Sequence, residues 1–141
     1  MAERILVGYD GSELAASALA FAFETAPDAE VTALHVIQVP DGLLPAFEGP
    51  EIQLPVTEKA HEHAESILDE ARDIASEHGR ELETAIATGK PDQRIVERAA
   101  DGDYDMVVVG SHGRSGLSRV LLGSVAETVV RRAPVSVAVV R

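Results

Sequence analysis

The sequence predicts a single-domain α/β protein in which an open, five-stranded parallel sheet carries helices on both faces. Strand-like and helix-like segments alternate along the chain, which favours parallel strands joined by right-handed crossovers. The strand segments are nearly continuous apolar runs, as is typical of parallel strands covered on both sides. The chain has 141 residues and no internal repeat, so we expect one domain over residues 1–141.

The chain opens with a short apolar strand followed by an amphipathic helix. Arg4–Tyr9 is the strand-like run, and the turn Asp10-Gly11-Ser12 ends it. Ser12 is a suitable N-cap for a helix that reaches about Thr25, with apolar residues at helical spacing. Glu30–Ile37 then predicts the second strand.

A proline-rich segment at residues 40–56 interrupts this alternation. It is longer than a compact α/β fold needs, and such loops often serve as lids or partner surfaces. Thr57 is predicted to cap a long helix that ends at Gly79, a good C′ residue. Glu81–Thr88 predicts the third strand.

The rest of the chain completes the pattern with two more helices and two more strands. Pro91 suits the first turn of a helix, and Asp105–Gly110 predicts the fourth strand. Ser124–Arg132 predicts the last helix, and Val135–Val140 the last strand. That strand would be a long apolar edge, so we expect a second copy of the chain to pair with it in a homodimer.

Composition excludes several classes of protein. With 12 basic and 24 acidic residues the net charge is −12, which disfavours general nucleic-acid binding. The absence of cysteine excludes disulfides, thiolate metal sites and a cysteine nucleophile. No apolar run is long enough for a membrane helix and no signal-peptide pattern is visible, so we expect a soluble cytoplasmic protein.

The charge is also unevenly spread along the chain. Residues 1–102 hold most of the acidic surplus, whereas residues 103–141 have more arginines than carboxylates. The C-terminal third is therefore the better place for an anionic ligand. Abundant carboxylates with only two lysines resemble proteins from a salt-loaded cytoplasm, which is a halophile-like trait.

The strongest chemical signal follows the fourth strand. Gly110 and Gly113 end that strand, and Gly123-Ser124 opens the next helix. Glycines allow close main-chain approach to a ligand, and the helix N-terminus adds free N–H donors, while Arg114 and Arg119 add positive charge. This combination suits a polyphosphate, and a tight structural turn is the alternative. If the first and fourth strands are neighbours, this segment faces the turn after the first strand across a ligand crevice.

The spacing Gly110-x2-Gly113-x9-Gly123-Ser124 resembles the nucleotide-binding signature of the universal stress protein family. Residues 5–12 and 134–141 resemble the first and last strands of the same family, so the similarity covers the whole chain. The resemblance implies strand order 3-2-1-4-5 and a dimer. Because every signature position is intact, it also implies binding of ATP with Mg²⁺ or Mn²⁺ and a regulatory role in stress response.

The resemblance further implies which residues contact the ligand. Asp10 would lie near the ribose and the metal–phosphate region, and the main chain at Val36 would meet the adenine. The residues that would surround the phosphates and ribose are Val109, Gly110, His112, Gly113, Gly123, Ser124 and Val125, and Arg114 lies among them in the sequence.

Other candidate residues are interpreted more simply. His35 and His78 are predicted to be structural, and His61 and His63 to lie on a solvated helix face without a metal-binding spacing. Gly89-Lys90-Pro91 lacks the rest of a P-loop.

Two alternatives to a nucleotide-binding regulatory module stay open. One is a dimeric scaffold whose 40–56 loop binds a partner. The other is a slow ATPase or phosphate-transfer enzyme, for which His112 would be the residue to test. No general base with an orienting partner is recognisable, so we expect any hydrolysis to be slow.

Overall fold

The computed structural model describes residues 3–38, 58–112 and 122–141. Its sheet has the order β3-β2-β1-β4-β5, and all neighbouring strands are parallel. The strands are β1 (Arg4–Gly8), β2 (Glu30–Gln38), β3 (Glu83–Gly89), β4 (Met106–Gly110) and β5 (Ser136–Val140). The helices are α1 (Glu13–Thr25), α2 (Glu58–Glu77), α3 (Pro91–Asp101) and α4 (Ser124–Arg132). The predicted fold class and strand order are confirmed.

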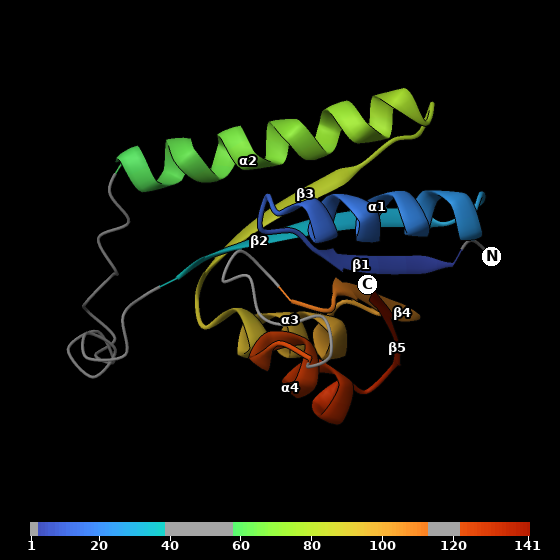
Figure 1. Ribbon diagram of the computed structural model, residues 1–141, viewed down its shortest axis with the longest axis vertical. Helices are drawn as coiled ribbons and strands as arrows, with labels where there is room; N and C mark the ends of the chain where they lie inside the picture. The colour runs from blue at the N-terminus through green and yellow to red at the C-terminus, as the bar shows by residue number, and fades with distance from the viewer. Residues whose placement is uncertain (1–2, 39–57, 113–121) are drawn as a thin grey trace.

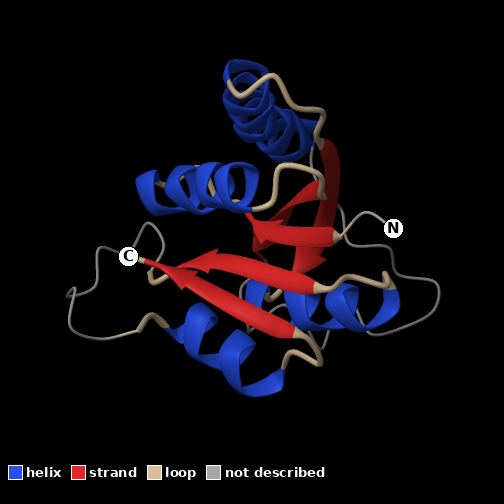
Figure 2. Cartoon of the chain, turned by 90° about the vertical axis from the view of Figure 1, so that its right-hand side faces the viewer, coloured by secondary structure: helices blue, strands red, loops and turns tan. Residues whose placement is uncertain are grey.

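Helices cover both faces of the sheet. Helices α1 and α2 lie on one face, and α3 and α4 on the other (Figures 1 and 2). Alternate residues of one strand serve the two layers: Ile5 and Val7 pack into the cluster under α1 and α2, whereas Leu6 packs into the cluster under α3 and α4. This is why the strands are apolar at nearly every position.

The predicted elements agree with the structure to within two residues at the strand ends. The end of α2 shows how local sequence sets such a boundary. Gly79 has φ +64°, and its N–H donates to the Ser76 carbonyl at 3.0 Å while the Arg80 N–H donates to the Ala75 carbonyl at 2.9 Å. These two bonds form a Schellman motif, as the position of the glycine predicts.

Two predictions fall outside the described ranges, namely the 40–56 loop and the cap at Thr57. Strand β5 is one edge of the sheet, as predicted, and β3 is the other. Within the described ranges, no helix combines the length and apolarity needed to cross a membrane.

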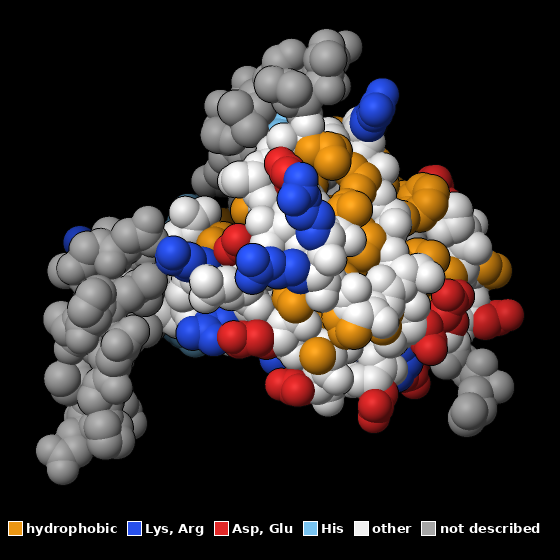
Figure 3. Space-filling view, turned by 90° about the horizontal axis from the view of Figure 1, so that it is seen from below, with side chains coloured by type: hydrophobic (Ala, Val, Ile, Leu, Met, Phe, Trp, Pro, Cys, Tyr) orange, Lys and Arg blue, Asp and Glu red, His pale blue; other side chains and the backbone are white. Residues whose placement is uncertain are grey.

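The face over α3 and α4 mixes basic and apolar side chains, with acidic side chains gathered toward one side of the view (Figure 3). The last turn of α4 carries Arg131 and Arg132, and Val130 beside them is 47% exposed.

Candidate functional site

The connections after β1 and β4 leave the sheet in opposite directions. These strands are neighbours, but β1 leads into α1 on one face and β4 leads toward α4 on the other. Such a switch point opens a crevice beyond the carboxyl ends of the strands. A cavity of about 690 Å³ lies there, within the size range of small-molecule sites.

The cavity brings together most of the residues that the sequence indicated. Those that line it are Asp10, Val36, Val109, Gly110, His112, Gly123, Ser124 and Val125. Gly113 and Arg114 lie outside the described residues. Residues from β1, β2, β4 and α4 thus meet in one place, although more than 100 positions separate the first from the last.

The turn after β1 fixes the carboxylate of Asp10 beside the cavity. The Ser12 N–H donates to Asp10 Oδ1 at 2.9 Å, and Gly11 adopts φ +83° to make the turn. The Ser12 Oγ in turn accepts the Ala15 N–H at 3.1 Å and caps α1, as predicted. One short segment therefore starts a helix and orients an acidic group.

The start of α4 is held against the ends of β4 and β5. The Ser111 N–H donates to the Val140 carbonyl at 2.7 Å, and the Gly123 N–H donates to the Ser111 carbonyl at 2.6 Å. No side chain of the described residues caps α4, and its first residues, Ser124 and Val125, line the cavity. The free N–H groups and the positive end of the helix dipole favour an anion at this position.

The glycines of the motif also have a packing role. A Cβ at Gly110 would lie 2.8 Å from Leu14 Cβ, and one at Gly123 would lie 3.1 Å from His112 Cα and 3.2 Å from the Ser111 carbonyl oxygen. Both positions therefore require glycine for a close approach of two chain segments. The structural-turn interpretation explains part of the motif, and the uncapped helix start carries the case for an anion.

Four cavity residues were missed by the analysis of sequence. Tyr9, His35, His63 and Lys90 all line the cavity. Lys90 occupies the N-cap position of α3, whose first turn also faces the cavity. The interpretation of His63 as part of a solvated face was incomplete, because its exposed side chain borders the cavity. For His35 a signal existed, since a polar residue within a doubly covered strand must find a buried partner.

Tyr9 contributes a buried phenol to this region. It is 4% exposed, and burial raises the pKa of its hydroxyl above the ordinary 10.0, with further increases from Glu70 and Asp10. Tyr9 is therefore neutral at physiological pH.

The site residues fit a divalent cation only in combination with a ligand. Among the described residues there is no group of three or more His, Asp or Glu that could hold a metal. Mg²⁺ is commonly held by one or two carboxylates together with substrate phosphates. Asp10 can supply one carboxylate of that kind.

A doubly wound parallel sheet, with a cavity at its switch point and a helix N-terminus facing it, defines an α/β domain built to bind a small ligand. The sequence matches the universal stress protein family over residues 1–141. The chain belongs to this family.

Comparison with individual proteins agrees with this assignment. Universal stress protein MJ0531 of Methanocaldococcus jannaschii is 36% identical over 99% of this chain and 82% of its own length. Universal stress protein YxiE of Bacillus subtilis is 32% identical over the full length of both chains.

Solved structures show the same fold. The structure of MJ0577 of M. jannaschii has a TM-score of 0.79 at 33% identity and covers 99% of this chain and 96% of its own. A universal stress protein crystallised in complex with cAMP has a TM-score of 0.72 at 26% identity, covering 99% and 97%.

Proposed function

We propose that this universal stress protein binds ATP with a divalent cation and acts as a nucleotide-responsive regulatory module. The observation that carries the proposal is the uncapped start of α4 at the switch-point cavity, opposite the carboxylate of Asp10. A helix N-terminus attracts phosphate, and a nearby carboxylate attracts the cation that accompanies it. The complex of a family member with cAMP supports a nucleotide as the ligand class.

Each part of the cavity has a role in this proposal. The first N–H groups of α4 and the Ser124 hydroxyl bind the phosphates. Asp10 binds the cation or the ribose, and the main chain of Val36 binds the adenine. When bound, Mg²⁺ or Mn²⁺ neutralises phosphate charge beside Asp10, which would otherwise repel the ligand.

We further propose that the regulatory form is a homodimer joined through β5. This strand is at the edge of the sheet, and four of its five residues are only partly buried within one chain. Edge strands with apolar side chains are normally covered. Sedimentation of the chain at micromolar concentration tests this: we expect a dimer, and a clean monomer would contradict it.

The nucleotide proposal is tested by titration calorimetry with ATP and Mg²⁺ on nucleotide-free protein. We expect about one ATP per chain from the single cavity described here. Titrations with ADP, AMP and cAMP rank the alternatives within the same ligand class. Absence of binding by any of them would contradict the proposal and favour a scaffold role.

A charge variant sharpens this test. Ser124→Asp adds a negative charge in the first turn of α4, which favours the helix but repels phosphate. We expect ATP affinity to fall at least tenfold with no loss of thermal stability. Ser136→Asp, at the opposite end of the sheet, is the matched control and should bind as the wild type does. Equal affinity in the wild type and Ser124→Asp would remove the phosphates from α4.

A further inference from the structure

The hydrogen-bonded ladder between β1 and β2 stops where the cavity begins. The register runs from Arg4↔Glu30 to Gly8↔Leu34, and one more bond follows it, from the Tyr9 N–H to the Leu34 carbonyl at 2.9 Å. In a parallel ladder, alternate residues of a strand turn their N–H and C=O toward the same neighbour. The next bond of this ladder would therefore run from the Val36 N–H to the Tyr9 carbonyl.

A side chain takes that position instead. The Tyr9 carbonyl oxygen lies 2.9 Å from Nδ1 of His35, and the main-chain bonds of the described residues include none from Val36 to Tyr9. A carbonyl can only accept, so Nδ1 carries the hydrogen and donates it. His35 is 8% exposed, so this bond is made in a largely buried place.

This substitution of a side chain for a backbone donor has a consequence for Val36. Leu34 faces β1, and by the same alternation the N–H and C=O of Val36 point the same way, past the end of β1. Val36 lines the cavity. Its N–H and C=O are thus directed to the place where a ligand would sit, and the groups of the residue between them serve β3.

We propose that His35 is a specificity-determining residue: by occupying the Tyr9 carbonyl, its imidazole ends the β1–β2 ladder and keeps the main-chain N–H and C=O of Val36 available to an adenine edge. The same bond holds the residue that precedes Asp10. The adenine part of this inference rests on the proposed function, whereas the ladder part does not.

The chemistry of the two groups defines the base that they select. A peptide N–H beside a peptide C=O offers one donor and one acceptor. Adenine presents the complement on one edge, with N1 as acceptor and the N6 amino group as donor. Guanine presents N1–H and O6, which reverses the pattern and leaves both protein groups unsatisfied. A site of this kind prefers ATP to GTP.

Two substitutions of His35 separate the donor from the rest of the ring. His35→Asn places an amide N–H near the position of Nδ1, so it keeps the bond to Tyr9. His35→Leu removes the donor and leaves the Tyr9 carbonyl open to the Val36 N–H. We expect the wild type and His35→Asn to prefer ATP over GTP at least tenfold by calorimetry, and His35→Leu to lose most of that preference. Equal preference in all three folded proteins would overturn the role in selection.

A second measurement needs no ligand. Amide hydrogen exchange and NMR couplings across hydrogen bonds report the partner of each N–H. In the wild type and His35→Asn we expect the Val36 amide to exchange rapidly, and in His35→Leu to become protected and coupled to the Tyr9 carbonyl. A protected Val36 amide in the wild type would overturn the inference whether or not ATP binds. If the wild type binds no nucleotide at all, the proposed function and the base preference both fail, and Val36 exchange still decides the role of His35 in the ladder.

Discussion

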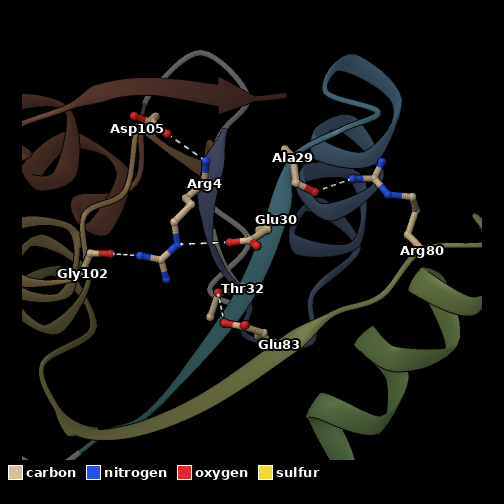
Figure 4. A network of polar contacts seen from close by, with 8 residues as sticks. All are labelled: Arg4, Ala29, Glu30, Thr32, Arg80, Glu83, Gly102 and Asp105. Carbon is tan, nitrogen blue, oxygen red and sulfur yellow. Dashed lines mark hydrogen bonds and ion pairs between the residues drawn. The ribbon is translucent and has the colours of Figure 1, made fainter. Parts of the chain in front are cut away.

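The two ends of the sheet have cavities of similar size but opposite chemistry. The amino end has a cavity of about 650 Å³, against about 690 Å³ at the carboxyl end. At the amino end the protein uses its own polar groups: Arg4 binds the Gly102 carbonyl and Glu30, and Arg80 binds main-chain carbonyls at the end of α1 (Figure 4). At the carboxyl end, α4 starts without a side-chain cap among the described residues, and the β1–β2 ladder stops short.

This difference teaches that cavity volume alone does not identify a ligand site. The amino-end cavity is lined by four acidic residues, and its one basic residue, Arg80, is already engaged. A phosphate there would meet repulsion and no free donor. The carboxyl-end cavity presents free helix N–H groups and only two carboxylates, Asp10 and Asp92. Polar groups left unsatisfied by the fold distinguish the end that awaits a ligand.

The largest expected effect breaks the amino end. Arg80 donates to the carbonyl oxygens of Phe23, Ala26 and Ala29 at 2.7–3.1 Å, and its guanidinium lies 5.1 Å from the centre of the Phe23 ring. Arg80→Ala removes these contacts together. We expect the free energy of unfolding to fall by about 2–4 kcal/mol in chemical denaturation. ATP affinity should stay at the wild-type value, because the change lies at the opposite end of the sheet.

A matched arginine calibrates this result. Arg72 also makes several polar contacts, but its ion pairs with Glu65 and Asp69 involve side chains that are at least 41% exposed. Arg72→Ala should therefore cost less than about 1 kcal/mol. If Arg72→Ala and Arg80→Ala were equally destabilising, the argument that Arg80 closes the amino end would fail.

The second prediction sharpens the carboxyl end. Asp10→Asn keeps an oxygen to accept the Ser12 N–H but removes the negative charge. We expect about a tenfold loss of affinity for ATP with Mg²⁺, and much less loss for ATP without a divalent cation. Calorimetry at several Mg²⁺ concentrations measures this difference. An unchanged Mg²⁺ dependence would show that Asp10 does not face the cation.

Much of this comparison could be predicted from sequence, because its main elements depend on local patterns. The alternation of strands and helices, the cap at Ser12 and the glycine at the end of α2 are all set within a few residues. Lys90 was not predicted as a cavity residue, because its place depends on where the return from β3 to α3 meets the sheet. The role of His35 depends on the register of two strands 26 positions apart, which no local pattern specifies.

A third, smaller effect concerns the segment that serves both fold and site. Ser12→Ala removes the oxygen that caps α1 but leaves the main-chain N–H that binds Asp10. We expect the free energy of unfolding to fall by about 1 kcal/mol, and Ser12→Asn, with another good capping side chain, to recover most of it. Thermal denaturation of the three proteins checks this. A loss as large in Ser12→Asn as in Ser12→Ala would contradict a capping role.

The smallest effect is confined to alkaline pH and tests how dry the carboxyl end is around Tyr9. Burial, with smaller contributions from Glu70 and Asp10, raises the pKa of the Tyr9 hydroxyl above its ordinary 10.0. As the pH rises past 10, the unfolded chain loses this proton before the folded chain does. The free energy of unfolding should therefore fall in the window from pH 10 up to the folded-state pKa. Denaturation from about pH 9 to pH 11 should show a shallower fall for Tyr9→Phe than for the wild type. Glu70→Gln should lie between them, because it removes one contributing charge and keeps the burial. Parallel curves for the wild type and Tyr9→Phe would mean that solvent reaches the hydroxyl, and the cavity wall beside Asp10 would then be wetter than its 4% exposure indicates.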